Sequence, residues 1–229
     1  MIGNKKVFGL IQVRENSQRI PGKNMQILNG KPLPMWVLNE AKKCKHDDGS
    51  NYFDDIYVST SSKNYQRIFL DWGCKIIFRP SELSCSNVPN LEVYKHAINF
   101  IPCHDDDYIV HLDICKPLTK ALTMKMIIGC ADDNNLDSCY TVKKFRHTLV
   151  GQSAIPTHQL EEVYVNFGAV RLLTKETIEK AEIGTWGKGE NHIDLPIIKD
   201  YEIDIDYMHD LAIAEFLMSV PEYYFNRYE

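Results

Sequence analysis

Short apolar runs alternate along the chain with longer stretches in which apolar residues recur every three or four positions. The short runs predict buried β-strands, and the periodic stretches predict helices. We expect strands at Lys6–Val13, Asp55–Ser59, Lys75–Phe78, Tyr108–Leu112, Ser138–Val142, Gly168–Leu173 and Tyr201–Ile205. We expect helices over Pro32–Cys44, Ser62–Trp72, Leu91–Phe100, Leu118–Ala131 and Tyr207–Val220, and a short helix from Lys175.

This alternation indicates an α/β fold with a mixed, mainly parallel sheet and helices on both faces. The 229 residues contain no linker, low-complexity stretch or internal repeat, so we expect one domain over 1–229. Residues 144–165 show no clear periodicity and are too long for a passive connection. We therefore expect this segment to cover a site or to contact a partner.

Composition and charge narrow the function classes. The chain is 44% hydrophobic and 25% charged, as in ordinary globular proteins, and its net charge of −5 argues against a nucleic-acid surface. The longest apolar runs are too short to cross a membrane. Seven scattered cysteines, an odd number without a CxxC pair, favour a reduced cytoplasmic compartment.

Positive charge is concentrated in VRENSQRIPGKN, residues 13–24, directly after the first predicted strand. This segment holds Arg14, Arg19 and Lys23 together with Ser17. Guanidinium, ammonium, hydroxyl and turn amide groups are donors that hold a polyphosphate, and the carboxyl end of a first strand is where open α/β sheets bind ligands. The alternative is a solvated surface turn. Neither a Walker nor a GxGxxG motif is present, so P-loop and dinucleotide enzymes gain no support.

Asp204 and Asp206 are the second chemical signal. On an extended chain their spacing places both carboxylates on one face, with Ile203 and Ile205 on the other. Two such carboxylates repel unless a cation lies between them, and Mg²⁺ favours carboxylate and phosphate oxygens. The alternative is that Asp206 caps the following helix while Asp204 is solvated. Together with the basic loop, the pair predicts a nucleotidyl-transfer site.

With both elements present, the chain resembles the acylneuraminate cytidylyltransferase family, whose members make CMP-activated sugar acids such as CMP-sialic acid and other nonulosonates. The basic loop is similar to the family's R-x-x-S-x-x-x-P-x-K-N motif. Further similar segments follow in the family's order over nearly the whole chain. They are GKPLPMW at 30–36, YVSTSSKNYQ at 57–66, FRPSELS at 78–84 and IDIDYMHDLAIAE at 203–215.

The resemblance implies a Rossmann-like nucleotide-diphospho-sugar transferase domain that binds CTP and Mg²⁺. It implies that the anomeric hydroxyl of a sugar acid attacks the α-phosphorus and that pyrophosphate leaves. The implied nucleotide-binding residues are Arg14, Ser17, Lys23, Asn24, Arg79 and Asn90, the metal ligands are Asp204 and Asp206, and the catalytic residues are Arg14, Lys23 and Asp206. For Arg79 the alternative to nucleotide binding is a surface ion pair.

Two segments depart from the family's pattern on the acceptor side. LDICKPL at 112–118 brings Asp113 to the position of a sugar-facing glutamine, where the alternative is a cap for the next helix. THQLEEVYVNFGAV at 157–170 lacks the arginines that help to bind an acidic sugar. The expected acceptor-binding residues are Asp113, Arg146, His147, Phe167 and Gly168.

The family's dimer-forming hairpin corresponds to residues 144–165, so the resemblance also implies a homodimer.

The resulting hypothesis is a Mg²⁺-dependent cytidylyltransferase that acts on CTP and a sugar acid. The alternatives are a nucleotidyltransferase for another sugar or nucleotide, an inactive nucleotide- or sugar-binding relative, and a DxD glycosyltransferase. The last is disfavoured because the carboxylates of such enzymes usually follow a mid-chain strand.

Overall fold

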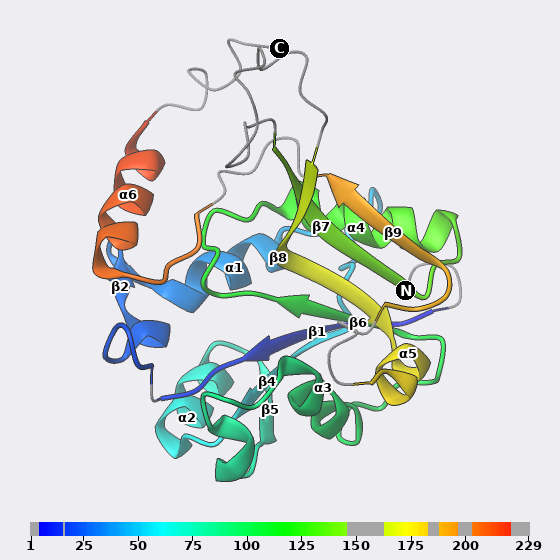
Figure 1. Cartoon of the computed structure of the whole chain (residues 1–229), viewed down its shortest axis with the longest axis horizontal. Helices are drawn as coiled ribbons and strands as arrows, with labels where there is room; N and C mark the ends of the chain where they lie inside the picture. The colour runs from blue at the N-terminus through cyan, green and yellow to red at the C-terminus, as the bar shows by residue number, and fades with distance from the viewer. Residues whose placement is uncertain (1–4, 16, 146–162, 183–187, 197–202, 221–229) are drawn as a thin grey trace, which may run out of the picture.

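The computed structural model of the chain describes residues 5–15, 17–145, 163–182, 188–196 and 203–220. Its centre is a seven-stranded sheet with the strand order β5-β4-β1-β6-β8-β7-β9 (Figure 1). Within this sheet β8 is antiparallel to both neighbours and the other pairings are parallel, which confirms the mixed, mainly parallel sheet. The strands are β1 (Val7–Gln12), β4 (Asp55–Thr60), β5 (Lys75–Phe78), β6 (Tyr108–Leu112), β7 (Ser138–Phe145), β8 (Val163–Thr174) and β9 (His192–Pro196).

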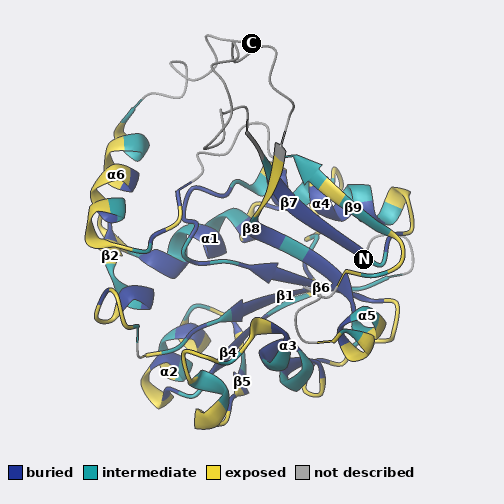
Figure 2. Ribbon diagram, in the orientation of Figure 1, coloured by how far each residue is buried: buried dark blue, intermediate teal, exposed yellow. Residues whose placement is uncertain are grey.

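Helices cover both faces of the sheet, as the alternating pattern predicts. Three of them pack on one face and two on the other, and the central strands between them are buried (Figure 2). Among the helices that the structure describes, none has the length and apolar character needed to span a bilayer. The first face carries α1 (Leu33–Lys42), α2 (Lys63–Asp71) and α4 (Ala121–Asp133), and the second carries α3 (Asn90–Ile98) and α5 (Lys175–Lys180).

Side-chain alternation along β1 explains why the sheet has two apolar cores. Val7 and Ile11 belong to the core under α1, α2 and α4, whereas Phe8 and Leu10 belong to the core under α3. Because both faces of β1 are covered, its sequence is a continuous apolar run rather than an alternating one. The residues that follow β1 therefore leave the sheet at a rigidly packed position.

A third apolar cluster lies where α6 (Met208–Ser219) meets a small hairpin formed by β2 (Ile27–Leu28) and β3 (Lys31–Pro32) (Figure 1). The Ile205 amide donates a hydrogen bond to the Cys115 carbonyl at 2.8 Å. The cluster therefore fixes the residues before α6 against the loops that follow β1 and β6. Its buried members are Ile20, Leu28, Leu33, Leu118, Ile203, Ile205, Leu211 and Ala214.

The strand predicted at Tyr201–Ile205 is wrong over its described part, because residues 203–206 lie outside the sheet. Isoleucine and aspartate do alternate in this segment, but Ile203 and Ile205 pack into the third cluster and not onto a face of the sheet. The strand beside β7 is instead β9, which pairs with residues 138–142 in parallel. Its sequence offers only Ile193 and Leu195 as apolar side chains, too few to predict a strand.

Residues 144–165 begin and end in paired strands, since Phe145 pairs with Val163 and Lys144 with Tyr164 across β7 and β8. These strand ends account for the part of the segment that the structure describes. Residues 146–162 lie outside the described residues.

Replacing Ile205 with alanine tests whether the third cluster fixes the segment that carries the acidic pair. Ile205 is 0% exposed, and we expect Ile205→Ala to lower the free energy of unfolding by about 2–5 kcal/mol. Ile213→Ala is the control, because Ile213 on α6 is 46% exposed and its truncation should cost less than about 1 kcal/mol. Urea unfolding measures both, and equal losses would contradict the prediction.

Candidate active site

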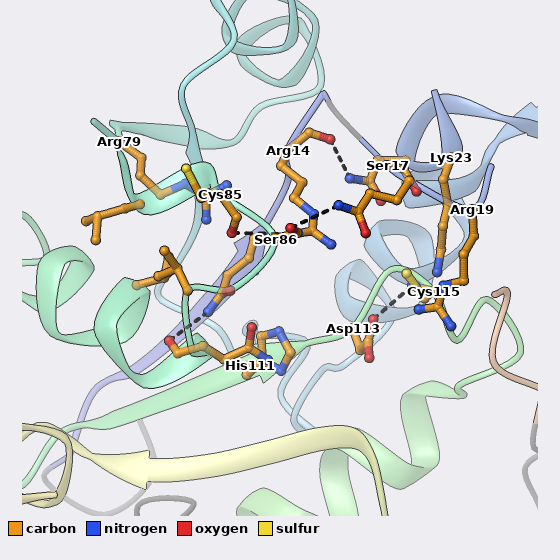
Figure 3. Close-up of a pocket in the computed structure, with 17 residues that line it drawn as sticks. Arg14, Ser17, Arg19, Lys23, Arg79, Cys85, Ser86, His111, Asp113 and Cys115 are labelled. Atoms are coloured by element: carbon orange, nitrogen blue, oxygen red, sulfur yellow. Dashed lines mark hydrogen bonds between the residues drawn. The ribbon is translucent and has the colours of Figure 1, made fainter. Parts of the chain in front are cut away.

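A cavity of about 450 Å³ opens at the carboxyl ends of β1 and β6 (Figure 3). Because β4 and β5 extend the sheet from one side of β1 while β6 lies on the other, this is the switch point at which open α/β sheets bind ligands. All of the nucleotide-binding residues expected from the sequence line this cavity, and so does one expected acceptor residue. They are Arg14, Ser17, Lys23, Asn24, Arg79, Asn90 and Asp113.

The basic loop is held from inside by its own polar groups. Gly22 has a φ of 61°, a left-handed conformation that favours glycine, and it leads into the 3₁₀ turn η1 (Lys23–Met25). The Asn24 side chain donates to the Arg14 carbonyl at 2.7 Å. Lys23 is 7% exposed. A solvated surface turn is therefore the wrong description of this part of the loop.

Arg79 lies at the opposite end of the cavity from Lys23, with Arg14 between them (Figure 3). It is 3% exposed, so the alternative of a surface ion pair is wrong. Its guanidinium donates to the Val13 carbonyl at 3.0 Å and to the Ser84 hydroxyl, in the turn η2 (Ser81–Ser84), at 3.1 Å. Burial, aided by the charge of Arg14, lowers the pKa of Arg79 to about 10, so it remains a cation at neutral pH.

Asp206, in the segment before α6, forms ion pairs with two residues of the basic loop. One carboxylate oxygen accepts from Lys23 Nζ at 2.9 Å and the other from Arg19 Nη1 at 2.7 Å. Burial alone would raise the pKa of Asp206, but its hydrogen bond and charge interactions with Lys23 and those with Arg19 lower it. The helix-cap alternative is wrong, because Asp210 accepts from the backbone amides of Asp206 and Tyr207 at the start of α6.

Asp204 and Asp113 share one ammonium group. Lys116 Nζ lies 2.8 Å from Asp204 Oδ2 and 2.9 Å from Asp113 Oδ2. Burial opposes ionisation of Asp113, yet Lys116 and His111 lower its pKa to about 2. Burial raises the pKa of Asp204, and Lys116 opposes that rise. Asp113 also accepts from the Cys115 amide at 2.9 Å, so it stabilises its own turn and is not a helix cap.

The two C-terminal carboxylates have the right chemistry for Mg²⁺, which is usually held by one or two carboxylates and substrate phosphates. The protein's own cations contact three of their oxygens, two on Asp206 and one on Asp204. Over the described ranges, no three His, Cys, Asp or Glu side chains are grouped closely enough to hold a metal ion. The carboxylates therefore fit Mg²⁺ only as part of a set that a bound triphosphate completes.

Of the other predicted acceptor residues, Phe167 and Gly168 are described and do not line the cavity. Lys116 Nζ lies 5.0 Å from the ring centroid of Phe167 in β8. Gly168 has a φ of 67°, and a Cβ added there would collide with the Arg171 guanidinium, so this glycine permits a close approach within the sheet. Arg146 and His147 lie outside the described residues.

Several cavity residues are absent from the sequence-based site. Gln12, His111 and Cys115 line the cavity, and Lys116 contacts its acidic side. All four lie at or just beyond the carboxyl ends of β1 and β6. Their position after buried strands is a signal that the sequence does contain.

The fold is shared with solved structures of known proteins. The chain superposes on the solved structure of CMP:2-keto-3-deoxy-manno-octonic acid synthetase complexed with CTP with a TM-score of 0.68, at 12% identity, covering 94% of this chain and 99% of that one. It superposes on 4-diphosphocytidyl-2C-methyl-D-erythritol synthase from Anaerococcus prevotii with a TM-score of 0.64, at 14% identity, covering 96% and 98%. At these identities the similarity establishes the α/β fold.

Sequence comparison gives the family. Residues 8–181 match the family described as Cytidylyltransferase, so the chain belongs to the cytidylyltransferase family. It is 25% identical to N-acylneuraminate cytidylyltransferase of Oncorhynchus mykiss, over 93% of this chain and 50% of the relative, and 24% identical to the enzyme of that name from Streptococcus agalactiae serotype III, over 90% and 51%. The chain thus spans about half the length of these curated relatives.

Acid titration tests the electrostatics of Asp113. A carboxylate whose pKa falls from 3.8 to about 2 on folding adds stability that is present above its unfolded pKa and is lost as pH falls through about 2. The expected contribution is about 2 kcal/mol. Urea unfolding from pH 6 to pH 2 should show a shallower acid-induced loss for Asp113→Asn than for the unmodified protein. Asp106→Asn, at an exposed position, is the control, and equal slopes for all three proteins would contradict the prediction.

Proposed function

We propose that this protein is a Mg²⁺-dependent cytidylyltransferase that transfers CMP from CTP to the anomeric hydroxyl of a sugar acid of the nonulosonate type and releases pyrophosphate. The observation that carries the proposal is the contact between the basic loop and Asp206, at 2.7 and 2.9 Å, beside a cavity at the switch point of the sheet. Family membership supports the nucleotide, and the names of the relatives support the sugar acid.

The proposed triphosphate site is the cationic side of the cavity. Arg14 and Lys23 would bind the phosphate oxygens, with the Ser17 hydroxyl as a further donor. Lys23 suits this role because it already has a carboxylate partner, whose place a phosphate oxygen can take. Burial works against the charge of Lys23, but Cys115 and Asp206 outweigh it and raise the pKa of this lysine, which keeps it an ammonium at neutral pH.

The nucleoside would occupy the other end of the cavity. Arg79 is fixed there by hydrogen bonds to Val13 and Ser84 and would contact the base. Asn90 begins α3 at the cavity wall and would contact the ribose. Asn24 would contribute through the backbone geometry that it imposes on Arg14, in addition to any direct contact with the nucleoside.

In the proposed reaction a bond forms between the anomeric oxygen and the α-phosphorus, the bond to the bridging oxygen breaks, and pyrophosphate leaves. Ionised Asp206 would accept a hydrogen bond from the attacking hydroxyl, whose proton passes to solvent, while Arg14 and Lys23 stabilise the charge on the leaving group. Alignment and charge neutralisation supply most of the rate acceleration in such displacements. A Mg²⁺ ion held by Asp204 and Asp206 would add charge neutralisation on the triphosphate.

The acceptor side is proposed to include Asp113, Phe167 and Gly168, with Arg146 and His147 as the residues that bind the sugar carboxylate. The ion pair with Lys116 removes much of the repulsion that a free Asp113 would exert on an acidic sugar. We also propose that residues 144–165 form a homodimer contact, as the resemblance to the acylneuraminate cytidylyltransferases implies.

A pyrophosphate-release assay with CTP, Mg²⁺ and a panel of 2-keto sugar acids tests the reaction. We expect release with at least one acid, and we expect Lys23→Gln to lower kcat/KM by about 10²–10³ because a preorganised cation at the triphosphate is lost. Lys31→Gln is the matched control, since Lys31 is exposed on β3 and lies over Trp36. No release with any acid, or equal losses in both variants, would contradict the assignment.

Nucleotide selectivity is tested by thermal unfolding in the presence of CTP, UTP, GTP or ATP. A ligand that binds the folded state stabilises it by about 2.7 kcal/mol at a concentration 100-fold above its Kd. We expect CTP to raise Tm most and Lys23→Gln to reduce that shift. A larger shift with another nucleotide would favour a nucleotidyltransferase of different specificity, and a CTP shift without any pyrophosphate release would favour an inactive binding relative.

A further inference from the structure

Lys116 is a buried cation between two carboxylates that belong to different parts of the chain. Its side chain is 6% exposed, and its ammonium contacts Asp113 at 2.9 Å and Asp204 at 2.8 Å. Asp113 directly follows β6, whereas Asp204 lies in the segment that precedes α6. The ring of Phe167 covers the ammonium at 5.0 Å from the ring centroid. Two carboxylates and an aromatic face thus enclose a single positive charge.

This arrangement places an ammonium where two carboxylates would otherwise face each other. Carboxylate pairs of this kind repel unless a cation lies between them, and a divalent metal ion is one cation that relieves the repulsion. The neighbouring Asp206 is paired with Lys23 and Arg19 in the same way. The three carboxylates are therefore matched by three cations of the chain itself, and the cluster gives little net attraction for a metal ion.

We propose that Lys116 is a resident cation that competes with a divalent metal ion for Asp113 and Asp204, so that the nucleotide-free protein binds metal weakly. The meaning of this competition for catalysis rests on the proposed function. An incoming triphosphate brings negative charge to which Lys23 and Arg19 can turn, and with it the metal gains oxygen ligands that the free protein does not offer. Metal entry is thereby coupled to nucleotide entry, while Lys116 keeps the metal affinity of the nucleotide-free protein low.

Metal titration of the nucleotide-free protein tests the competition without any turnover. Free Mn²⁺ is measured by electron paramagnetic resonance as it is titrated into the unmodified protein, Lys116→Met and Lys116→Arg. Methionine keeps an apolar chain against Phe167 but removes the charge. We expect Lys116→Met to bind Mn²⁺ at least about ten-fold more tightly than the unmodified protein, because two unmatched carboxylates then face each other. Lys116→Arg keeps the positive charge and should bind Mn²⁺ as weakly as the unmodified protein.

Lys75→Met is the matched control, because it removes the lysine of an ion pair with Asp55 at 2.7 Å that does not line the cavity. Lys75 and Asp55 are the first residues of β5 and β4, whereas the cavity opens at the carboxyl ends of the strands. Its Mn²⁺ affinity should equal that of the unmodified protein. Equal affinities for Lys116→Met and the unmodified protein overturn the proposal, and so does a gain in Lys75→Met of the same size.

A second variant keeps the test decisive if Lys116→Met is unstable. Lys116→Gln retains an amide that can donate to the carboxylates without the positive charge, and it should show the same gain in Mn²⁺ affinity. A Lys116 variant that folds only when Mn²⁺ is added also supports the proposal, since the metal then replaces the missing cation. Variants that remain unfolded with Mn²⁺ overturn it.

The two claims fail separately. If no sugar acid yields pyrophosphate but Lys116→Met still binds Mn²⁺ more tightly, the competition stands and the proposed reaction falls. If pyrophosphate is released but the Lys116 variants bind Mn²⁺ no better than the unmodified protein, the reaction stands and the competition falls.

Discussion

The contact between Asp206 and the two cations Arg19 and Lys23 connects the segment before α6 to the loop that follows β1. It links residues separated by 187 and 183 positions, and both of its cations line the cavity at the carboxyl edge of the sheet. The third apolar cluster fixes the position of Asp206, because Ile203 and Ile205 are buried in it on the face opposite to the carboxylates. Without that cluster the segment before α6 would have no fixed distance to the basic loop.

The electrostatic design of the site follows from this contact. Buried cations and carboxylates neutralise each other before any ligand arrives, which limits the cost of placing charges away from water. Lys23 and Lys116 are both nearly buried, and each contacts at least one carboxylate that lies on a different segment. On the proposed function, a triphosphate entering the cavity would replace carboxylates as the anionic partner, so the site would exchange ion pairs rather than create isolated charges.

Much of the fold could be predicted because the strands of the sheet centre are covered on both faces. The central strand β6 has the predicted bounds, and so does β5 at one edge of the sheet. The helix predicted over Ser62–Trp72 is α2, with the Ser62 hydroxyl accepting from the Tyr65 amide at its start. At the opposite edge, formed by β9, the sequence signal is weaker. The short β9 carries only two apolar side chains, which is too weak a pattern to predict a strand. Ile203 and Ile205 show the alternating pattern of a strand, but they pack in the cluster between α6 and the β2–β3 hairpin.

The cavity residues were predictable where chemistry and position coincide, as in the basic loop after β1. Lys116 was not, because its significance depends on Asp204, which is distant in sequence and reaches it through the packing of Ile205 against the loop after β6. The burial of Arg79 likewise depends on the Val13 carbonyl and the turn at Ser84. Sequence patterns report local periodicity, and these contacts are set by tertiary packing.

A crystal structure with CTP and Mg²⁺ bound tests the central claim most directly, because it locates the triphosphate relative to both charged clusters. The account predicts that the phosphates lie in the cavity after β1, in contact with Arg14 and Lys23, with the metal ion between them and the carboxylates of Asp204 and Asp206. Phosphates bound at another surface, or a metal ion remote from both carboxylates, would contradict it.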